Sequence, residues 1–223
     1  MATIDQTSAA ARPRKERKEN AARRRRQLID ATLSSIVENG LAGTTLATVA
    51  RAAGLSQGVA VFYFQNKQTL LSAAMADKYA AYQACWEAAR TRAGDDPARQ
   101  LRAMVHADFD AAICDADSLV VWHAFWGEAS VRPQYLEIAE AHDQARFKAL
   151  IEVVTALFAQ IGRPAEDAAE FVTTVEAISD GLWLRIHLAT GAMARQEARK
   201  ICTRFLATQI PERASVFLDA RED

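Results

Sequence analysis

Apolar residues recur along most of this chain at spacings of three and four, which is the period of an amphipathic helix. A first helix is predicted from about Arg23 to Asn39, with Leu28 and Ile36 among the residues on its buried side, and Gly40 ends it. The pattern therefore predicts an all-α protein of about nine helices. The later helices are predicted over residues 46–53, 57–63, 66–90, 97–114, 117–129, 133–161, 165–190 and 194–209.

Two of these helices are short and flank a tight turn. Thr44 or Thr45 is placed to cap the first, because a threonine hydroxyl accepts a hydrogen bond from a backbone N–H that has no partner inside the helix. Gly54 ends that helix, and Ser56 is placed to cap the next. This is the layout of a helix-turn-helix, whose second helix enters the major groove of DNA. An ordinary helical hairpin, which needs the same cap and turn, is the alternative.

The residues around this turn resemble those of a known family. The run Ala-Gly-Leu-Ser-x-Gly at 53–58, followed by Tyr-Phe-x-x-Lys-x-x-Leu at 63–70, is similar to the DNA-binding signature of the TetR family of bacterial regulators. The resemblance implies a three-helix DNA-binding domain followed by a helical domain for ligand binding and dimerisation. The chain departs from the signature at Val61, where many members have tyrosine, and at Phe62, where the family is often polar. Individual base contacts therefore do not transfer from the family.

Charge is distributed unevenly along the chain. Its 27 basic and 28 acidic residues nearly cancel, but residues 12–26 hold nine basic and two acidic residues, so the rest of the chain carries a net charge of −8. A basic end on an acidic body concentrates the attraction for DNA phosphates at one pole. We divide the chain into a flexible basic arm over 1–22, the helix-turn-helix domain over 23–70, an effector-binding and dimerisation domain over 71–211, and a tail over 212–223.

The helix-turn-helix predicts a set of DNA contacts. Helix N-termini and short polar side chains hold phosphates, while the exposed face of the second helix reads base edges. Phe62 has two interpretations, since it either presses on a thymine methyl or packs under the following helix. The predicted contacts are Arg23, Arg24, Arg25 and Arg26 at the backbone or the adjacent minor groove, Thr44, Thr45, Tyr63 and Lys67 at phosphates, and Ser56, Gln57, Val59 and Phe62 at bases.

Three of the four tryptophans lie in two short segments of the second domain. Trp122 and Trp126 are i, i+4 neighbours on one helical face, and Trp183 follows Asp180 in a later helix. Aromatic faces beside a carboxylate suit a quaternary ammonium, whose diffuse charge has no N–H to donate. Plain core filling is the alternative, because large aromatic residues commonly anchor cores. The predicted effector site comprises Trp86, Phe109, Asp110, Trp122, Phe125, Trp126, Asp180 and Trp183.

A narrower resemblance points to the effector. The segments RRRQLIDATL (24–33), AFW (124–126) and DGLWLR (180–185) are similar to those of the choline-responsive repressors of glycine betaine synthesis, a subfamily of the TetR regulators. This resemblance implies a repressor of genes that convert choline to glycine betaine, an osmoprotectant, with choline as its effector. Choline would act through the helix over 66–90, which spans both domains. A TetR-type regulator of an efflux or catabolic operon with another hydrophobic or cationic effector is the alternative, and a small helical enzyme is a remote one.

The last two long helices carry wide apolar faces. A homodimer that reads two half-sites of a palindromic operator, about 34 Å apart, needs an interface between its subunits. In the TetR family the final helices form a four-helix bundle between subunits. The alternative is that both faces are core of the monomer. The predicted interface comprises Phe171, Val175, Ile178, Ile201 and Phe205.

Other functions find little support in the sequence. No apolar run reaches the roughly 18 residues of a membrane-spanning helix, and three scattered cysteines are typical of reduced thiols in the cytoplasm. His106, Asp110 and His123 lack a further ligand at a recognisable spacing, so neither a metal nor a cofactor is expected. The sequence holds no phosphate-binding glycine loop, nucleophile elbow or pair of catalytic carboxylates. We therefore expect a cytoplasmic regulator rather than an enzyme.

Overall fold

The computed structural model describes residues 14–129, 132–188 and 193–219. These residues form ten α-helices and two short 3₁₀ helices without a strand, which confirms the all-α prediction. The N-terminal domain contains α1 (Arg14–Gly43), α2 (Leu46–Ala52) and α3 (Gln57–Phe64). The second domain contains α4 (Lys67–Arg92), α5 (Pro97–Ala107), α6 (Ala116–Ala129), α7 (Pro133–Ile161), η1 (Ala165–Asp167), α8 (Ala168–Leu188), α9 (Arg195–Gln209), η2 (Pro211–Arg213) and α10 (Ala214–Phe217).

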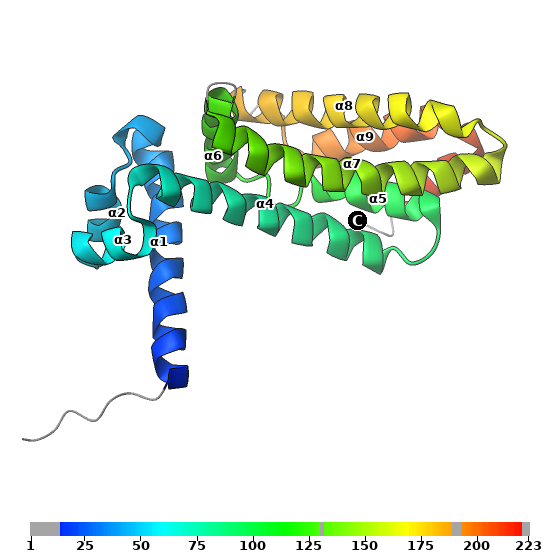
Figure 1. The fold of residues 1–223 in the computed structure, drawn as a ribbon. Coiled ribbons are helices and arrows are strands. Elements are labelled where there is room, and N and C mark those ends of the chain that lie inside the picture. Colours follow the sequence, from blue (N-terminus) through cyan, green and yellow to red (C-terminus); the bar gives the residue numbers. More distant parts are fainter. Residues whose placement is uncertain (1–13, 130–131, 189–192, 220–223) are drawn as a thin grey trace, which may run out of the picture.

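The N-terminal domain follows from its helix caps and turns. Thr45 and Thr48 form a capping box at the start of α2, in which the backbone N–H of each bonds to the hydroxyl of the other, and Ser56 caps α3. Gly40 (φ 65°) interrupts α1, and Gly54 (φ 66°) forms the turn between α2 and α3. Figure 1 shows both short helices beside the upper part of α1. Their shared core comprises Leu28, Ile29, Val49, Ala50, Ala60, Phe64 and Leu70.

The first helix begins at Arg14, well before the predicted start at Arg23. Arginine, lysine, glutamate and alanine dominate residues 14–22, and all four have high helix propensity. No glycine or proline interrupts this stretch, so α1 extends away from its domain (Figure 1). Residues 14–22, which were assigned to a basic arm, are thus helical, and residues 1–13 of that arm lie outside the described residues.

The second domain is a helical bundle that is joined to the first through two helices. In Figure 1, α4 leaves α3 and runs along the bundle, with α7 and α8 stacked above it. The C-terminal half of α1 also packs on α6. Ile36 of α1 belongs to the core of the second domain, and Leu33 and Val37 pack against that core. A displacement of either α4 or α6 would therefore also move the N-terminal domain, because both helices pack on α1.

Helix α5 ends at Ala107 instead of continuing to residue 114 as predicted. Aspartates in the following stretch bond to nearby backbone N–H groups and so compete with the helix. The Asp110 carboxylate accepts from Ala112 N–H at 2.9 Å, and the Asp115 carboxylate accepts from Ser118 N–H at 2.7 Å. The chain consequently turns after Ala107, and this turn shapes the site described below.

The C-terminal segment is folded as far as the structure describes it. Residues 212–223 were assigned to a tail, but α10 packs against α5 and α9, and the side chain of Phe217 is fully buried. Arg213 forms an ion pair with Asp96 and donates to the Gln160 side chain at 2.7 Å. Apolar burial and these polar contacts attach residues 212–218 to the bundle, so the tail assignment is corrected for them.

Candidate effector cavity and DNA-binding surface

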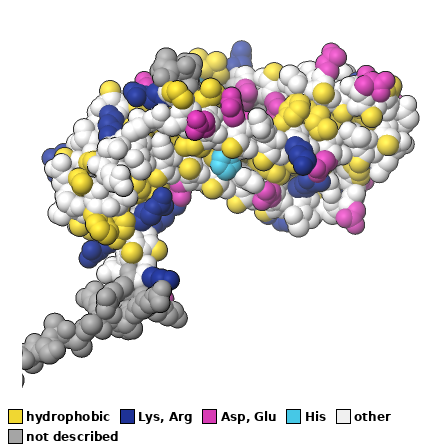
Figure 2. Space-filling view, viewed as in Figure 1, with side chains coloured by type: hydrophobic (Ala, Val, Ile, Leu, Met, Phe, Trp, Pro, Cys, Tyr) yellow, Lys and Arg dark blue, Asp and Glu magenta, His cyan; other side chains and the backbone are white. Residues whose placement is uncertain are grey.

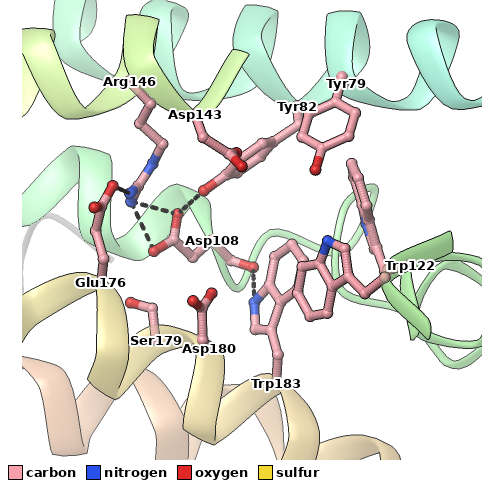
Figure 3. Close-up of a pocket in the computed structure, with 11 residues that line it drawn as sticks. Tyr79, Tyr82, Asp108, Trp122, Asp143, Arg146, Glu176, Ser179, Asp180 and Trp183 are labelled. Carbon is pink, nitrogen blue, oxygen red and sulfur yellow. Dashed lines mark hydrogen bonds and ion pairs between the residues drawn. The ribbon is translucent and has the colours of Figure 1, made fainter. Parts of the chain in front are cut away.

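A cavity of about 260 Å³ lies inside the second domain. Side chains from α4, α6, α7 and α8 point into it, together with one from the turn after α5 (Figure 3). One side of the cavity is aromatic and the other is charged. Its lining comprises Tyr79, Tyr82, Asp108, Trp122, Trp126, Asp143, Arg146, Glu176, Ser179, Asp180 and Trp183.

A buried ion pair holds the charged side together. Asp108 accepts from Arg146 Nη2 at 2.8 and 2.9 Å and from the Tyr82 hydroxyl at 2.7 Å. Arg146 also donates to Glu176 at 2.9 Å, while the backbone carbonyl of Asp108 accepts from Trp183 Nε1 at 2.8 Å. Asp108 is 1% exposed and Arg146 is 5% exposed, so these charge-assisted bonds form away from water. The network joins α4, α7, α8 and the turn after α5.

The aromatic side is a cluster of indole and phenol rings. Trp126 and Trp183 stack with their centroids 5.7 Å apart and their planes 17° apart. The Trp122 centroid lies 5.8 Å from that of Trp183, and the Tyr82 centroid lies at the same distance from Trp183 on another side. Tyr79 meets Trp122 edge to face at 4.9 Å. Ring faces with negative quadrupoles therefore border a cavity that also contains carboxylates.

The cavity has a negative net charge. Its lining holds the carboxylates of Asp108, Asp143, Glu176 and Asp180 but only one guanidinium, that of Arg146, which gives −3 when every group is ionised. Burial, reinforced by Asp180 and Glu176, raises the pKa of Asp143 to about 6. Burial and the charge of Asp108 also raise the pKa of Asp180. A bound cation would relieve the repulsion between carboxylates, which adds to the effect of burial in both shifts.

The structure brings four of the eight predicted effector residues to the cavity: Trp122, Trp126, Asp180 and Trp183. The other four do not line it. Trp86, Phe109 and Phe125 are buried in the core, and Asp110 is turned toward the backbone of its own loop. Asp108 lines the cavity in place of Asp110, and both residues lie in the turn that follows the end of α5 at Ala107.

Sequence reasoning missed the remaining lining residues, most of which are polar. Tyr79 and Tyr82 lie one turn apart on α4, and Asp143 and Arg146 lie one turn apart on α7. The sequence signal that could have identified them is a pair of polar residues three positions apart on an otherwise apolar helical face. Glu176 and Ser179 form a third such pair on α8.

The exposed surface of α3 contains several of the predicted base contacts. Ser56 and Gln57 are exposed, Val59 is half-buried, and Phe62 is 79% exposed. Phe62 touches the Tyr63 ring edge to face at 5.2 Å and does not pack under α4, so the second interpretation of this residue is wrong. On the face seen in Figure 2, several basic side chains border the N-terminal domain, while most acidic ones lie over the second domain.

Three of the predicted DNA contacts make hydrogen bonds or ion pairs within the protein. Thr44 is fully buried, and its hydroxyl donates to the Gly40 carbonyl at 2.9 Å. Its side chain therefore does not face the DNA-binding surface, and this predicted contact is wrong. Arg26 pairs with Asp30 and Asp77 and thereby links α1 to α4. Lys67 Nζ donates to the Ala42 carbonyl at 3.0 Å. Thr45 and the arginines at 23, 24 and 25 are exposed, as is Arg51, which sequence reasoning overlooked.

Comparisons with known proteins match both parts of the chain to one family of proteins. A family model described as "BetI-type transcriptional repressor, C-terminal" matches residues 97–211, and one described as "Bacterial regulatory proteins, tetR family" matches residues 28–74. The HTH-type transcriptional regulator BetI of Stenotrophomonas maltophilia is 35% identical over 187 residues, covering 84% of this chain and 93% of that protein. BetI of Burkholderia thailandensis is 37% identical over 191 residues, covering 86% and 95%.

This chain belongs to the TetR family of transcriptional regulators and is of the BetI type. Solved structures share the TetR fold. A putative transcriptional regulator from Pseudomonas aeruginosa PAO1 aligns with a TM-score of 0.77 at 22% identity, covering 96% of this chain and all of that one. A putative regulator from Saccharomonospora viridis, solved in complex with choline, aligns at 0.73 and 17% identity, covering 83% and 96%. The named relatives are regulators of transcription, so this TetR-family chain is a regulator rather than an enzyme.

Two of the residues predicted at a dimer interface of this BetI-type regulator are core residues of the monomer. Phe171 is 5% exposed and Val175 is 3% exposed, and Phe171 packs between Phe158 and Phe205. Ile178, Ile201 and Phe205 are half-buried. The apolar face predicted on α8 therefore turns inward along its first half.

The described residues include neither a metal-binding cluster nor a helix that could span a membrane. Over that part of the chain, no group of three or more histidine, cysteine, aspartate or glutamate side chains is arranged to hold a metal ion. The described helices also include none with the length and hydropathy needed to cross a membrane.

The role of Asp108 is open to a direct test. Asp108→Ala would leave the Arg146 guanidinium buried with only Glu176 as a carboxylate partner, and we expect the free energy of unfolding to fall by about 3 kcal/mol. Asp110→Ala removes the same charge two residues away, outside the cavity, and should cost less than about 1 kcal/mol. Urea unfolding of both variants measures the difference. Equal losses would contradict the assignment of Asp108 as the structural carboxylate.

Proposed function

We propose that this protein is a homodimeric operator-binding repressor whose effector is a small organic cation, with choline as the specific candidate. The proposal rests on the cavity itself. Its lining is aromatic on one side and carries a net charge of −3 when every group is ionised. The BetI relatives and the choline complex of the Saccharomonospora viridis regulator support the same ligand. On this account the protein controls genes that convert choline to glycine betaine.

The chemistry of the cavity favours a quaternary ammonium over other cations. Such a group has no N–H to donate, so ring faces and unpaired carboxylates bind it without requiring directed hydrogen bonds. Within the described part of the chain, neither Asp143 nor Asp180 makes a hydrogen bond or ion pair, so both remain for the ligand, whereas Asp108 is committed to Arg146.

The size of the cavity argues against a bulky effector. Pockets that hold drug-sized ligands enclose roughly 300–1,000 Å³, and this one encloses about 260 Å³. A regulator of an efflux operon that responds to large lipophilic cations would need more room. The small volume therefore supports choline or a close trimethylammonium relative.

The structure offers two connections from the cavity to the DNA-binding domain. Tyr79 and Tyr82 line the cavity from α4, whose first turn follows α3 directly. Trp122 and Trp126 line it from α6, which packs on α1. A ligand shifts an equilibrium between two conformations only by its difference in affinity for them. We propose that choline favours an arrangement of α4 and α6 in which the recognition helices no longer match two successive major grooves.

Choline binding should be visible in tryptophan fluorescence. Choline placed against Trp122, Trp126 and Trp183 is expected to give a saturable change in emission. Asp180→Asn removes one carboxylate from the cavity and should weaken binding by about tenfold. Asp117→Asn, which removes an exposed carboxylate from α6 outside the cavity, is the matched control. If choline gives no saturable signal and no heat in calorimetry, the effector assignment fails while the family assignment stands.

Choline affinity should also depend on pH. Asp143 has a pKa of about 6, so it takes up a proton below that pH and the cavity loses one negative charge. We expect choline affinity to fall about three- to tenfold between pH 7.5 and pH 5, because proton and cation compete for the same carboxylate. Since the pKa is raised on folding, ionisation of Asp143 opposes folding as the pH rises through 6, and bound choline offsets that effect. Asp143→Asn should remove most of the pH dependence.

On DNA, we propose that α3 lies in the major groove with Gln57 and Phe62 toward the bases. The exposed Phe62 ring supplies an apolar surface for a thymine methyl, and the Gln57 amide supplies a donor and an acceptor for a base edge. Thr45 at the start of α2, with the exposed arginines at 23, 24 and 25, would hold phosphates.

Phe62 and Phe64 form a matched pair for this test. Phe62→Ala removes a ring that packs on little else in the protein, so the free energy of unfolding should change by less than about 0.5 kcal/mol while operator affinity falls. Phe64→Ala removes a buried ring and should cost about 3–5 kcal/mol. Operator mobility shifts and thermal unfolding give the two readouts. Unchanged operator affinity in Phe62→Ala would contradict the proposed groove contact.

For the dimer interface we propose the outward stripe of α8 instead of its buried residues. Leu184 and Leu188 are 45% and 69% exposed, and Gly181 and Ala177 are exposed on the same helical face. A glycine inside a helix costs about 1 kcal/mol relative to alanine. Within the chain, a Cβ added at Gly181 would meet no atom within 4 Å, so the fold does not require glycine there. We propose that α8 of a second subunit packs closely against this face, which would explain the glycine at this position.

Gly181→Arg should therefore break the dimer, because it places a long charged side chain between two closely packed helices. Gly127→Arg is the control, since Gly127 is also an exposed helical glycine with no atom within 4 Å of an added Cβ. Sedimentation at micromolar concentration should show monomers for the first variant and dimers for the second. Dimers in both would exclude this stripe as the interface.

A further inference from the structure

Three consecutive residues of α4 contact three different parts of the molecule. Asp77 forms an ion pair with Arg26 of α1 at 2.6 Å, which links α4 to the DNA-binding domain. Lys78 Nζ donates to the Ser118 hydroxyl of α6 at 2.8 Å. Tyr79 lines the effector cavity. Successive side chains of a helix point about 100° apart, so this triplet, which we call the junction, reaches the DNA-binding domain, α6 and the cavity from one turn.

The contact between Lys78 and α6 has several components. Ser118 is only 7% exposed, so its hydroxyl bonds to the ammonium largely away from water. The same ammonium lies 5.6 Å from the centroid of the Trp122 ring, whose face attracts a cation. The charge of Asp115 also attracts it, and the Asp115 carboxylate accepts from the Ser118 N–H at the start of α6. Lys78 therefore holds the first turn of α6 and the Trp122 ring beside α4.

Neither packing nor contact with a ligand explains this lysine. Burial lowers the pKa of Lys78, because the charged form loses solvation. The ammonium also lies at the first turn of α6, where the helix dipole favours an anion over a cation. A methionine would fill a similar space without either cost. Lys78 does not line the effector cavity, so its contacts are with protein groups.

We propose that Lys78 is a positioning residue that transmits occupancy of the effector cavity to the DNA-binding domain, a role that rests on the proposed function of the cavity. Tyr79 of α4 meets the Trp122 ring of α6 edge to face at 4.9 Å, and both line the cavity (Figure 3). A cation that moves either ring shifts α4 and α6 together, because Lys78 joins the two helices there. The ion pair of Asp77 with Arg26 then carries the shift of α4 to α1.

Lys78→Met separates ligand binding from its effect on DNA. The variant removes the donor and its charge but keeps a long side chain. Choline affinity, measured by tryptophan fluorescence, should stay within about threefold of the wild-type value or become tighter, because a positive charge near the bound cation is removed. The factor by which saturating choline changes operator affinity should fall from about fivefold or more to less than about twofold.

Further variants distinguish transmission from a merely structural effect. Ser118→Ala removes the acceptor, leaves every charge in place and should also reduce the factor. Lys78→Arg keeps a cationic donor and should restore most of it. Lys148→Met, which removes an exposed lysine of α7 outside the cavity lining, is the matched control and should leave the factor unchanged. Because the factor is a ratio of two operator affinities, a uniform loss of DNA binding does not alter it.

An undiminished factor in folded Lys78→Met, or in Ser118→Ala if the first variant does not fold, would overturn the proposal. If the wild-type protein does not bind choline, the proposed effector fails, and the junction is judged by operator affinity without ligand. Lys78→Met should then lower that affinity by about threefold or more, since it frees α6 from α4 while both pack on α1. An operator affinity equal to that of Lys148→Met would overturn the junction as well.

Discussion

The buried pair of Asp108 and Arg146 is the interaction on which the effector cavity depends. Three helices, α4, α7 and α8, and the turn after α5 meet at these two side chains, through Tyr82, Glu176 and Trp183. Breaking a buried ion pair leaves an uncompensated charge, so the protein must retain both partners or neither. The pair also consumes the one positive charge of the cavity, which leaves Asp143 and Asp180 to face a ligand. A cation then completes an electrostatic arrangement that the protein alone leaves unbalanced.

This arrangement connects ligand binding to regulation by simple means. Trp122 and Trp126 come from α6 and the two tyrosines from α4, and these are the helices that contact the DNA-binding domain. In the proposed mechanism the ligand need not reach toward DNA, because it would change the packing of two helices, of which α6 touches α1 and α4 continues from α3.

The sequence predicted the helices well because their caps and periods are local properties. Thr45, Ser56, Gly40 and Gly54 act within a few residues of themselves, and the helix-turn-helix followed from them. The cavity could be predicted only in part. Tryptophans are visible in any sequence, but the pairing of Asp108 with Arg146 joins residues 38 positions apart and depends on where α5 ends. That end is decided by a competition between aspartate side chains and the helix backbone, which hydrophobic periodicity does not report. Phe171 and Val175 were misplaced for a related reason, since periodicity shows that a face is apolar without showing what covers it.

The central claim is that a cation in the aromatic cavity and an operator on α3 act on one equilibrium. The most direct test is the affinity of choline for the free protein and for the protein saturated with operator DNA, measured by tryptophan fluorescence under identical salt. The account predicts that the two dissociation constants differ by about fivefold or more, and that choline changes operator affinity by the same factor. Identical choline affinities in the two states would contradict it.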